Sequence, residues 1–212
     1  MILSNILIDF FIDGGPIMYP ILVVAVAAVC IIVERTFWWL TLSSRRDSKL
    51  LDKVYAALET GDSTEAIALS EKTRDPVVRM IHHGLNHRHS SLEGALQVAA
   101  GHELRNAGRF LTAMDTIVTL GPLLGLLGTV TGIMGSFTSI GDSELAVEKV
   151  TGGIGEALIA TAAGLGIAIT TLVPMNYFHS RIAALQFDLE AAANNVTLLA
   201  AQHGLTTVKP NA

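Results

Sequence analysis

Apolar residues are grouped along this chain into three long blocks, separated by polar stretches. The uncharged block Pro16–Val33, extended through Glu34 and Arg35, is long enough to cross a hydrocarbon core of about 30 Å as a helix, at about 1.5 Å of rise per residue. The blocks Thr116–Ile140 and Val150–Phe178 are also long enough to cross a bilayer. The pattern therefore predicts an all-α integral membrane protein with three transmembrane helices.

The distribution of positive charge predicts the orientation of these helices. Most basic residues lie between the first and second blocks, namely Arg35, Arg45, Arg46, Lys49, Lys53, Lys72, Arg74, Arg79, Arg88, Arg105 and Arg109. Loops rich in Lys and Arg stay in the cytoplasm, so the N-terminus is expected outside and the C-terminus inside. The predicted segments are a periplasmic segment 1–15, transmembrane helices 16–42, 110–140 and 150–178, a helical cytoplasmic region 43–109, a periplasmic loop 141–149, and a cytoplasmic helix and tail 179–212.

Composition narrows the possible functions. Half of the residues are hydrophobic, and the net charge of -5 gives no indication of a nucleic-acid partner. A cleaved signal peptide is not expected, because Asp9 and Asp13 precede the first block and no Lys or Arg does. The single Cys30 allows no internal disulfide. The sequence has no nucleophile elbow, phosphate loop or metal-ligand set, so neither enzyme activity nor a cofactor is expected.

Helix signals recur in the cytoplasmic region. The helical spacing of its apolar residues is interrupted at Gly61, after which Asp62 or Ser63 can cap a new helix. Pro76 marks a further break or helix start. A helix capped by Ser90 or Ser91 then runs without a breaker into the second block, which predicts one long helix, partly soluble and partly in the membrane.

Small residues are frequent in the second and third blocks. The second block carries glycines at a spacing of three or four residues, including Gly121, Gly125, Gly128 and Gly132. The third block has Gly164 among many alanines. Small residues let helix backbones approach closely in lipid, where no hydrophobic force drives helices together. These glycines are therefore interpreted as helix-packing positions.

Three polar residues in the same blocks are candidates for function. Glu156 is the only acid of the third block, and a buried charge in a membrane is costly enough that it usually faces a cavity, a partner or an ion path. The alternative is that Glu156 is hydrated at the outer interface or caps a neighbouring helix. Thr129 and Thr161 carry less information, because a threonine hydroxyl in a membrane helix often bonds the carbonyl one turn earlier.

Two further polar features stay open. The cluster His82, His83, His87 and His89 places two imidazoles on one helix face, yet no Cys, Asp or Glu with ligand spacing completes a metal site. Neutral histidines on a hydrated surface are the interpretation we prefer. Asp115, at the inner end of the second block, can pair with Arg109, line an exit or be solvated.

Two long motifs resemble the paired signature of the ExbB/TolQ/MotA proton-channel family. They are PLLGLLGTVTGIMGSF, residues 122–137, and GIGEALIATAAGLGIAI, residues 153–169. The first block is also similar to the first span of ExbB-like members. In the cytoplasmic region the likeness is limited to length and helical character. Three spans and a short chain favour the ExbB/TolQ branch over flagellar stators, which have a fourth span.

The resemblance implies a pentameric ring in the bacterial inner membrane, around single-span partners of the ExbD or TolR kind, with a TonB-like protein as a further partner. Each partner helix would carry an aspartate that takes and releases an ion. H⁺ is expected before Na⁺, but the sequence leaves this choice open because the ion-binding carboxylate would be on the partner. Thr129 and Thr161 would line the pore, and Glu156 matches the family's acid in the third span. Hydroxyls can hold water or an ion without a fixed charge.

One departure and one alternative qualify this hypothesis. Family members commonly have a proline shortly after the motif that ends in Thr161, whereas this chain has Thr170 there and Pro174 one turn later, which would move a kink toward the cytoplasm. The alternative function is a non-conducting membrane scaffold whose glycine-rich helices only assemble an envelope complex. The sequence leaves open which process such a motor would drive.

Overall fold

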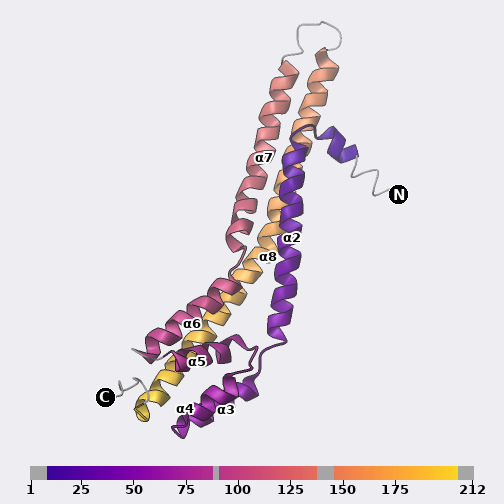
Figure 1. Ribbon diagram of the computed structural model, residues 1–212. Coiled ribbons are helices and arrows are strands. Elements are labelled where there is room, and N and C mark those ends of the chain that lie inside the picture. The colour runs from indigo at the N-terminus through magenta and orange to yellow at the C-terminus, as the bar shows by residue number, and fades with distance from the viewer. Residues whose placement is uncertain (1–8, 88–90, 138–145, 205–212) are drawn as a thin grey trace. The chain divides into compact units, whose positions relative to one another are not determined.

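The computed structural model describes residues 9–87, 91–137 and 146–204, and all regular structure in these ranges is helical (Figure 1). Its helices are α2 (Met18–Ser43), α3 (Ser48–Glu59), α4 (Ser63–Ser70), α5 (Pro76–Asn86), α6 (Leu92–Ala107), α7 (Leu111–Phe137) and α8 (Ala146–Gln202). Three helical stretches are long and apolar enough to cross a membrane: Met18–Ser43, Leu92–Phe137 and Val150–Gln202. The prediction of an all-α membrane protein with three such stretches is confirmed.

Capping side chains start the short helices at predicted positions. Asp62 accepts hydrogen bonds from the backbone N–H groups of Thr64 and Glu65 at the start of α4. Pro76 is the first residue of α5, where its missing N–H costs no helix bond. Ser91 caps α6 through the N–H of Gly94, at 3.2 Å; Ser90 lies outside the described residues. Local sequence therefore determines where these helices begin.

The prediction of one long helix through residues 91–137 is wrong. α6 ends at Ala107, and Gly108 donates its backbone N–H to the Leu104 carbonyl as a C-cap. Phe110 has a φ of 66°, a left-handed conformation that non-glycine residues rarely adopt, and α7 begins at the next residue. The break follows a glycine C-cap that comes one turn after a basic residue, Arg105.

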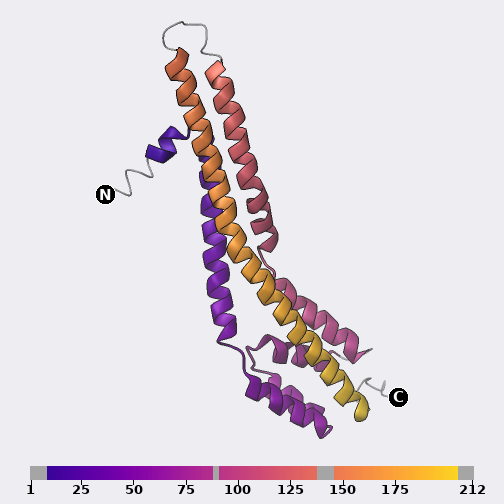
Figure 2. The same ribbon diagram turned by 180° about the vertical axis from the view of Figure 1, so that it is seen from behind.

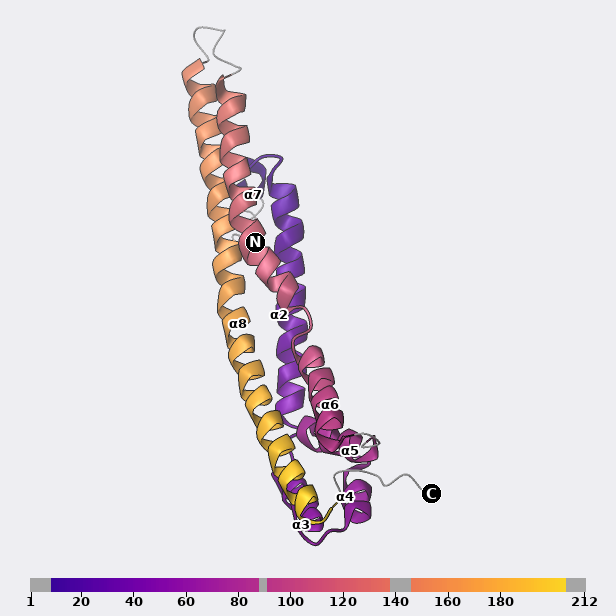
Figure 3. The ribbon, with the colours of Figure 1, turned by 90° about the vertical axis from the view of Figure 1, so that its left-hand side faces the viewer.

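The chain divides into two compact units, of which the first contains the amino-terminal part of α2, all of α7 and α8 as far as Tyr177. In this unit α7 and α8 run side by side in all three views (Figure 1, Figure 2 and Figure 3). The start of α2 packs on them through Met18 and Ile21, which form a buried cluster with Ala160 of α8.

The second unit comprises Thr36–Arg109 and Phe178–Ala212, and holds α3 to α6 with the carboxyl-terminal part of α8. Arg79 of α5 forms a two-armed ion pair with the buried Glu103 of α6, with Nε and Oε1 2.6 Å apart. This pair raises the pKa of the Arg79 guanidinium. An ion pair connects α8 to the segment before α3: the guanidinium of Arg46 lies 2.7 Å from the carboxylate of Asp188 on α8.

Three features noted in the sequence can be located in the described residues: the prolines of the membrane helices, the predicted loop 141–149, and Asp115. Pro174 and Pro122 are accommodated inside α8 and α7, which both continue past them. α8 begins at Ala146, inside the stretch 141–149 for which a loop was predicted; residues 141–145 lie outside the described residues. Asp115 is exposed on α7.

Candidate functional site

The close contact between α7 and α8 is made by backbone against backbone. A methyl group added to Gly121 would lie 2.8 Å from the carbonyl oxygen of Gly164, and one added to Gly132 would lie 2.9 Å from that of Gly153. Real Cβ atoms essentially never approach this closely. The contact therefore depends on glycine, the residue that permits such proximity between membrane helices.

The other two glycines assigned to packing lie on the same side of α7. A Cβ on Gly125 would lie 3.0 Å from the Cα of Thr161, and a Cβ on Gly128 would lie 2.9 Å from the side chain of Ile17 and 2.5 Å from that of Ala160. Gly135, by contrast, has open space around its Cα. One face of α7 thus carries the helix contacts, and Gly135 lies off it.

Thr161 bonds across this contact. Its hydroxyl lies 3.0 Å from the Gly125 carbonyl of α7 and 3.0 Å from the Ala157 carbonyl of its own helix. A hydroxyl has one proton to donate, which these two acceptors share, and its lone pairs stay available to a further donor. Thr161 therefore connects the two helices at a point where a glycine leaves the partner carbonyl accessible.

Glu156 lies about one turn before Thr161 on α8, half-buried, and opens onto a groove between the helices. The groove has a volume of about 650 Å³. Its lining includes Thr131 and Ser136 near the end of α7, Gly153 near the start of α8, and Pro16 just before α2. The Glu156 carboxylate occupies the space that a side chain at Gly15 would need, and Gly15 has a φ of +70°. A residue with a side chain there would be both strained and in collision with the carboxylate.

The hydroxyls nearest this groove were not singled out in the sequence. Ser136 is buried and donates to the Gly132 carbonyl at 2.9 Å, while Thr131 donates to the Leu127 carbonyl at 3.0 Å. Each is bonded within its own helix, which leaves its lone pairs as acceptors toward the groove. Glu156 is therefore accompanied by two hydroxyls of α7 in one partly polar space.

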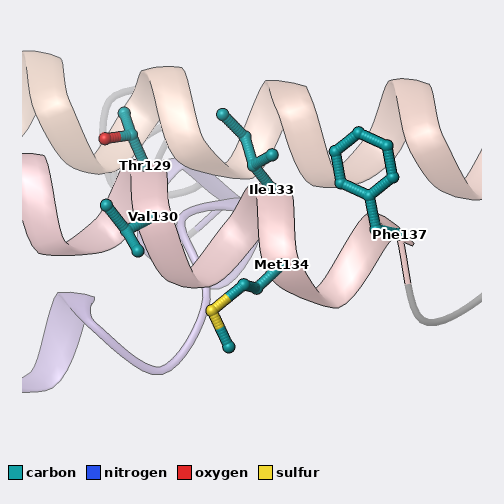
Figure 4. Close-up of a pocket in the computed structure, with 5 residues that line it drawn as sticks. All are labelled: Thr129, Val130, Ile133, Met134 and Phe137. Atoms are coloured by element: carbon teal, nitrogen blue, oxygen red, sulfur yellow. The ribbon is translucent and has the colours of Figure 1, made fainter.

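Thr129 lies on a different part of α7. Its hydroxyl donates to the Leu126 carbonyl at 2.6 Å, and its side chain lines an apolar groove of about 560 Å³ with Val130, Ile133, Met134 and Phe137 (Figure 4). All five side chains come from α7 (Figure 4). The structure thus brings Thr161 and Glu156 onto one stretch of α8, and it puts Thr129 in a groove that Glu156 does not line.

The histidine cluster does not form a metal centre among the residues described. No group of three or more His, Cys, Asp or Glu side chains in residues 9–87, 91–137 and 146–204 is arranged to hold an ion, and His89 lies outside these ranges. Burial, followed by the neighbouring His82 and His87, lowers the pKa of His83. The His82 ring contacts the Ser70 hydroxyl at 3.1 Å, so it packs α5 on α4.

The first unit thus has the features of a multispan membrane protein in which small residues join two helices beside a half-buried acid, Glu156. Comparison with known proteins specifies the class. Residues 72–191 match the model of the MotA/TolQ/ExbB proton channel family, and the chain belongs to this family.

Relatives with assigned names support the same conclusion. The biopolymer transport protein ExbB-like 1 of Synechocystis is 34% identical over 197 residues, which cover 89% of this chain and 76% of that protein. The ExbB-like 3 protein of the same organism is 38% identical over 181 residues, 79% of this chain and 82% of that protein. The biopolymer transport protein ExbB of Neisseria gonorrhoeae is 40% identical over 87 residues, 41% of this chain and 40% of that protein.

Proposed function

We propose that this protein is a subunit of an ion-driven motor that energises transport of large molecules across a cell envelope. Family membership supports the ion-channel class, and the names of the relatives support biopolymer transport. The observation that carries the proposal is the half-buried Glu156, held in a groove with Thr131 and Ser136 inside the apolar unit. An acid in a membrane helix is retained against a cost of about 2.5–3.5 kcal/mol, which favours a role in an ion path.

The proposal includes a location and an orientation. The helices cross the inner membrane of a bacterium with the N-terminus in the periplasm and residues 43–109 in the cytoplasm, as the concentration of Lys and Arg there favours. The chain has no second carboxylate in the apolar part of its third span. By analogy with the family, we assign the acid that takes and releases the ion to a single-span partner of the ExbD or TolR type.

In the proposed mechanism several copies, five by analogy with the family, surround the partner helix. Thr161 and Glu156 provide lone pairs and a charge along the path of a proton, while the glycine contact between α7 and α8 keeps each subunit rigid. Thr129 borders the path from its own groove on α7. One charge moving through 100 mV releases about 2.3 kcal/mol, which is enough to bias a step of the partner inside the ring.

The partner is the first part of the proposal to test. The full chain with a carboxyl-terminal tag is purified from the membranes of its own organism in mild detergent, and the co-purifying proteins are identified by mass spectrometry. We expect a small single-span protein with an aspartate in its membrane helix, together with several copies of this chain in the native mass. A complex that contains only copies of this chain would contradict the motor and favour a non-conducting scaffold.

A further inference from the structure

A basic groove in the second unit lies outside the site described above. Its volume is about 520 Å³, and its two walls are the end of α2 with the link to α3, and the link between α4 and α5. Its polar lining includes Thr41, Ser44, Arg45, Lys72, Thr73 and Arg74. Three cations and three hydroxyls thus share one groove, a composition suited to a phosphate group.

The three cations of this groove have no carboxylate in salt-bridge contact within residues 9–87, 91–137 and 146–204. None of Arg45, Lys72 and Arg74 forms an ion pair with a residue of the described ranges, whereas Arg46 and Arg79 nearby are each paired with a carboxylate. The one acid of the lining, Asp47, already accepts the Leu50 N–H at 3.0 Å as the N-cap of α3.

A buried carboxylate holds the two walls together. Asp75 is 4% exposed, and it accepts the backbone N–H of Asp47 at 2.8 Å from one wall and that of Val77 at 2.8 Å from its own. Thr73 accepts the Asp75 N–H at 3.1 Å, which leaves the Thr73 hydroxyl proton available to a ligand. The groove is therefore fixed by hydrogen bonds before any ligand arrives.

Chain connectivity places the groove at the level of lipid headgroups. Thr41, Ser44 and Arg45 lie at or just after the end of the apolar helix α2. Trp38 and Trp39, one turn earlier, are of the residue type that concentrates at the membrane–water interface. A phosphate that reaches this level in quantity is that of a membrane lipid.

We propose that this groove binds the phosphate of an anionic phospholipid, with Arg45, Lys72 and Arg74 as its cationic contacts and Thr73 as a hydroxyl donor. Basic pockets at the ends of membrane helices recognise anionic headgroups in this way. The site is independent of the ion pathway, because it needs neither Glu156 nor a partner protein.

The test uses the detergent-solubilised full chain in native mass spectrometry, with phosphatidylglycerol and phosphatidylcholine of the same acyl chains. One basic residue near an anionic surface contributes a factor of about five, so we expect Lys72→Gln/Arg74→Gln to lower phosphatidylglycerol affinity by about 30-fold and to abolish the preference over phosphatidylcholine. The matched control is Lys53→Gln/Arg105→Gln, which removes the same charge from exposed positions of the same unit. It should keep the preference, as should the conservative variant Lys72→Arg/Arg74→Lys.

Three results would overturn the proposal. Retained preference in the groove variant would show that these side chains bind no lipid. An equal loss in the groove and control variants would show an effect of net charge alone. The third result would be displacement of phosphatidylglycerol from the wild type by inorganic phosphate at millimolar concentration, which would show that the groove binds free phosphate. We expect phosphatidylglycerol to stay bound under these conditions.

Discussion

Replacing Gly164 with alanine tests the packing of the membrane unit at the closest backbone contact between α7 and α8. The added Cβ would collide with the carbonyl oxygen of Gly121, and it would lie 3.1 Å from both the Gly121 carbonyl carbon and the Gly125 nitrogen. All three are backbone atoms of α7, so no side-chain rotation can relieve the contact. The helices must separate, and with them the hydrogen bond between Thr161 and Gly125 lengthens from 3.0 Å.

The magnitude follows from two opposed effects. Overpacking of a tight contact costs about 1–3 kcal/mol, and the upper half of that range applies because the neighbours are backbone. Alanine regains about 0.5–1 kcal/mol over glycine as a helix former. The net expectation is a destabilisation of about 1–2 kcal/mol for Gly164→Ala.

Gly166→Ala is the matched control, because it lies two residues away on the same helix and a Cβ there has nothing within 4 Å. It should be neutral or stabilising by up to about 1 kcal/mol. Unfolding of each variant is followed by circular dichroism during titration with SDS in mixed micelles. Equal midpoints for the two variants would refute the close α7–α8 contact as the source of stability.

Three further variants test other contacts. Arg79→Met leaves Glu103 buried without its partner and should lower the free energy of unfolding by about 2 kcal/mol, which the double variant Arg79→Met/Glu103→Leu should recover in thermal melts; no recovery would count against the pair. The pKa of His83 is lower in the folded protein than in the unfolded chain, so the unfolded chain binds a proton at this imidazole more readily. The contribution of His83 to the free energy of unfolding is therefore greatest above about pH 6.5 and decreases as the pH falls below that value. His83→Gln should flatten that part of the melting-temperature profile, and an unchanged profile would contradict the assignment. Thr161→Val removes the bond to Gly125 and should cost about 0.6 kcal/mol in the SDS titration, while Thr161→Ser should retain it.

Much of the fold follows from local signals in the sequence. Apolar length alone predicts the three membrane stretches, and capping chemistry locates the starts at Asp62, Pro76 and Ser91. The break between α6 and α7 at residues 108–110 was not predicted, because Phe110 is not a residue type that favours a positive φ. Gly108 was a visible signal, yet a lone glycine in a helical pattern is also tolerated within helices.

The candidate site was predictable only in part, because tertiary packing decides which side chains of α7 and α8 face one another. Glu156 could be found as the one acid in an apolar block, without knowledge of its neighbours. Thr131 and Ser136 could not be distinguished from Thr129 by composition, since all three hydroxyls bond carbonyls of their own helix. Only the rotation of α7 against α8 decides which of them shares a groove with the acid.

The rate at which protons cross the membrane through the complex tests the proposed function most directly. The chain and its co-purified partner are reconstituted in liposomes, and decay of an imposed pH gradient is followed with an internal pH-sensitive dye. Glu156→Gln should slow the partner-dependent decay by at least about tenfold, a loss of about 1.4 kcal/mol in the barrier, while Glu190→Gln, an exposed acid on the same helix, should leave it unchanged. Equal rates for wild type and Glu156→Gln in an intact complex would contradict the assignment of Glu156 to the ion pathway.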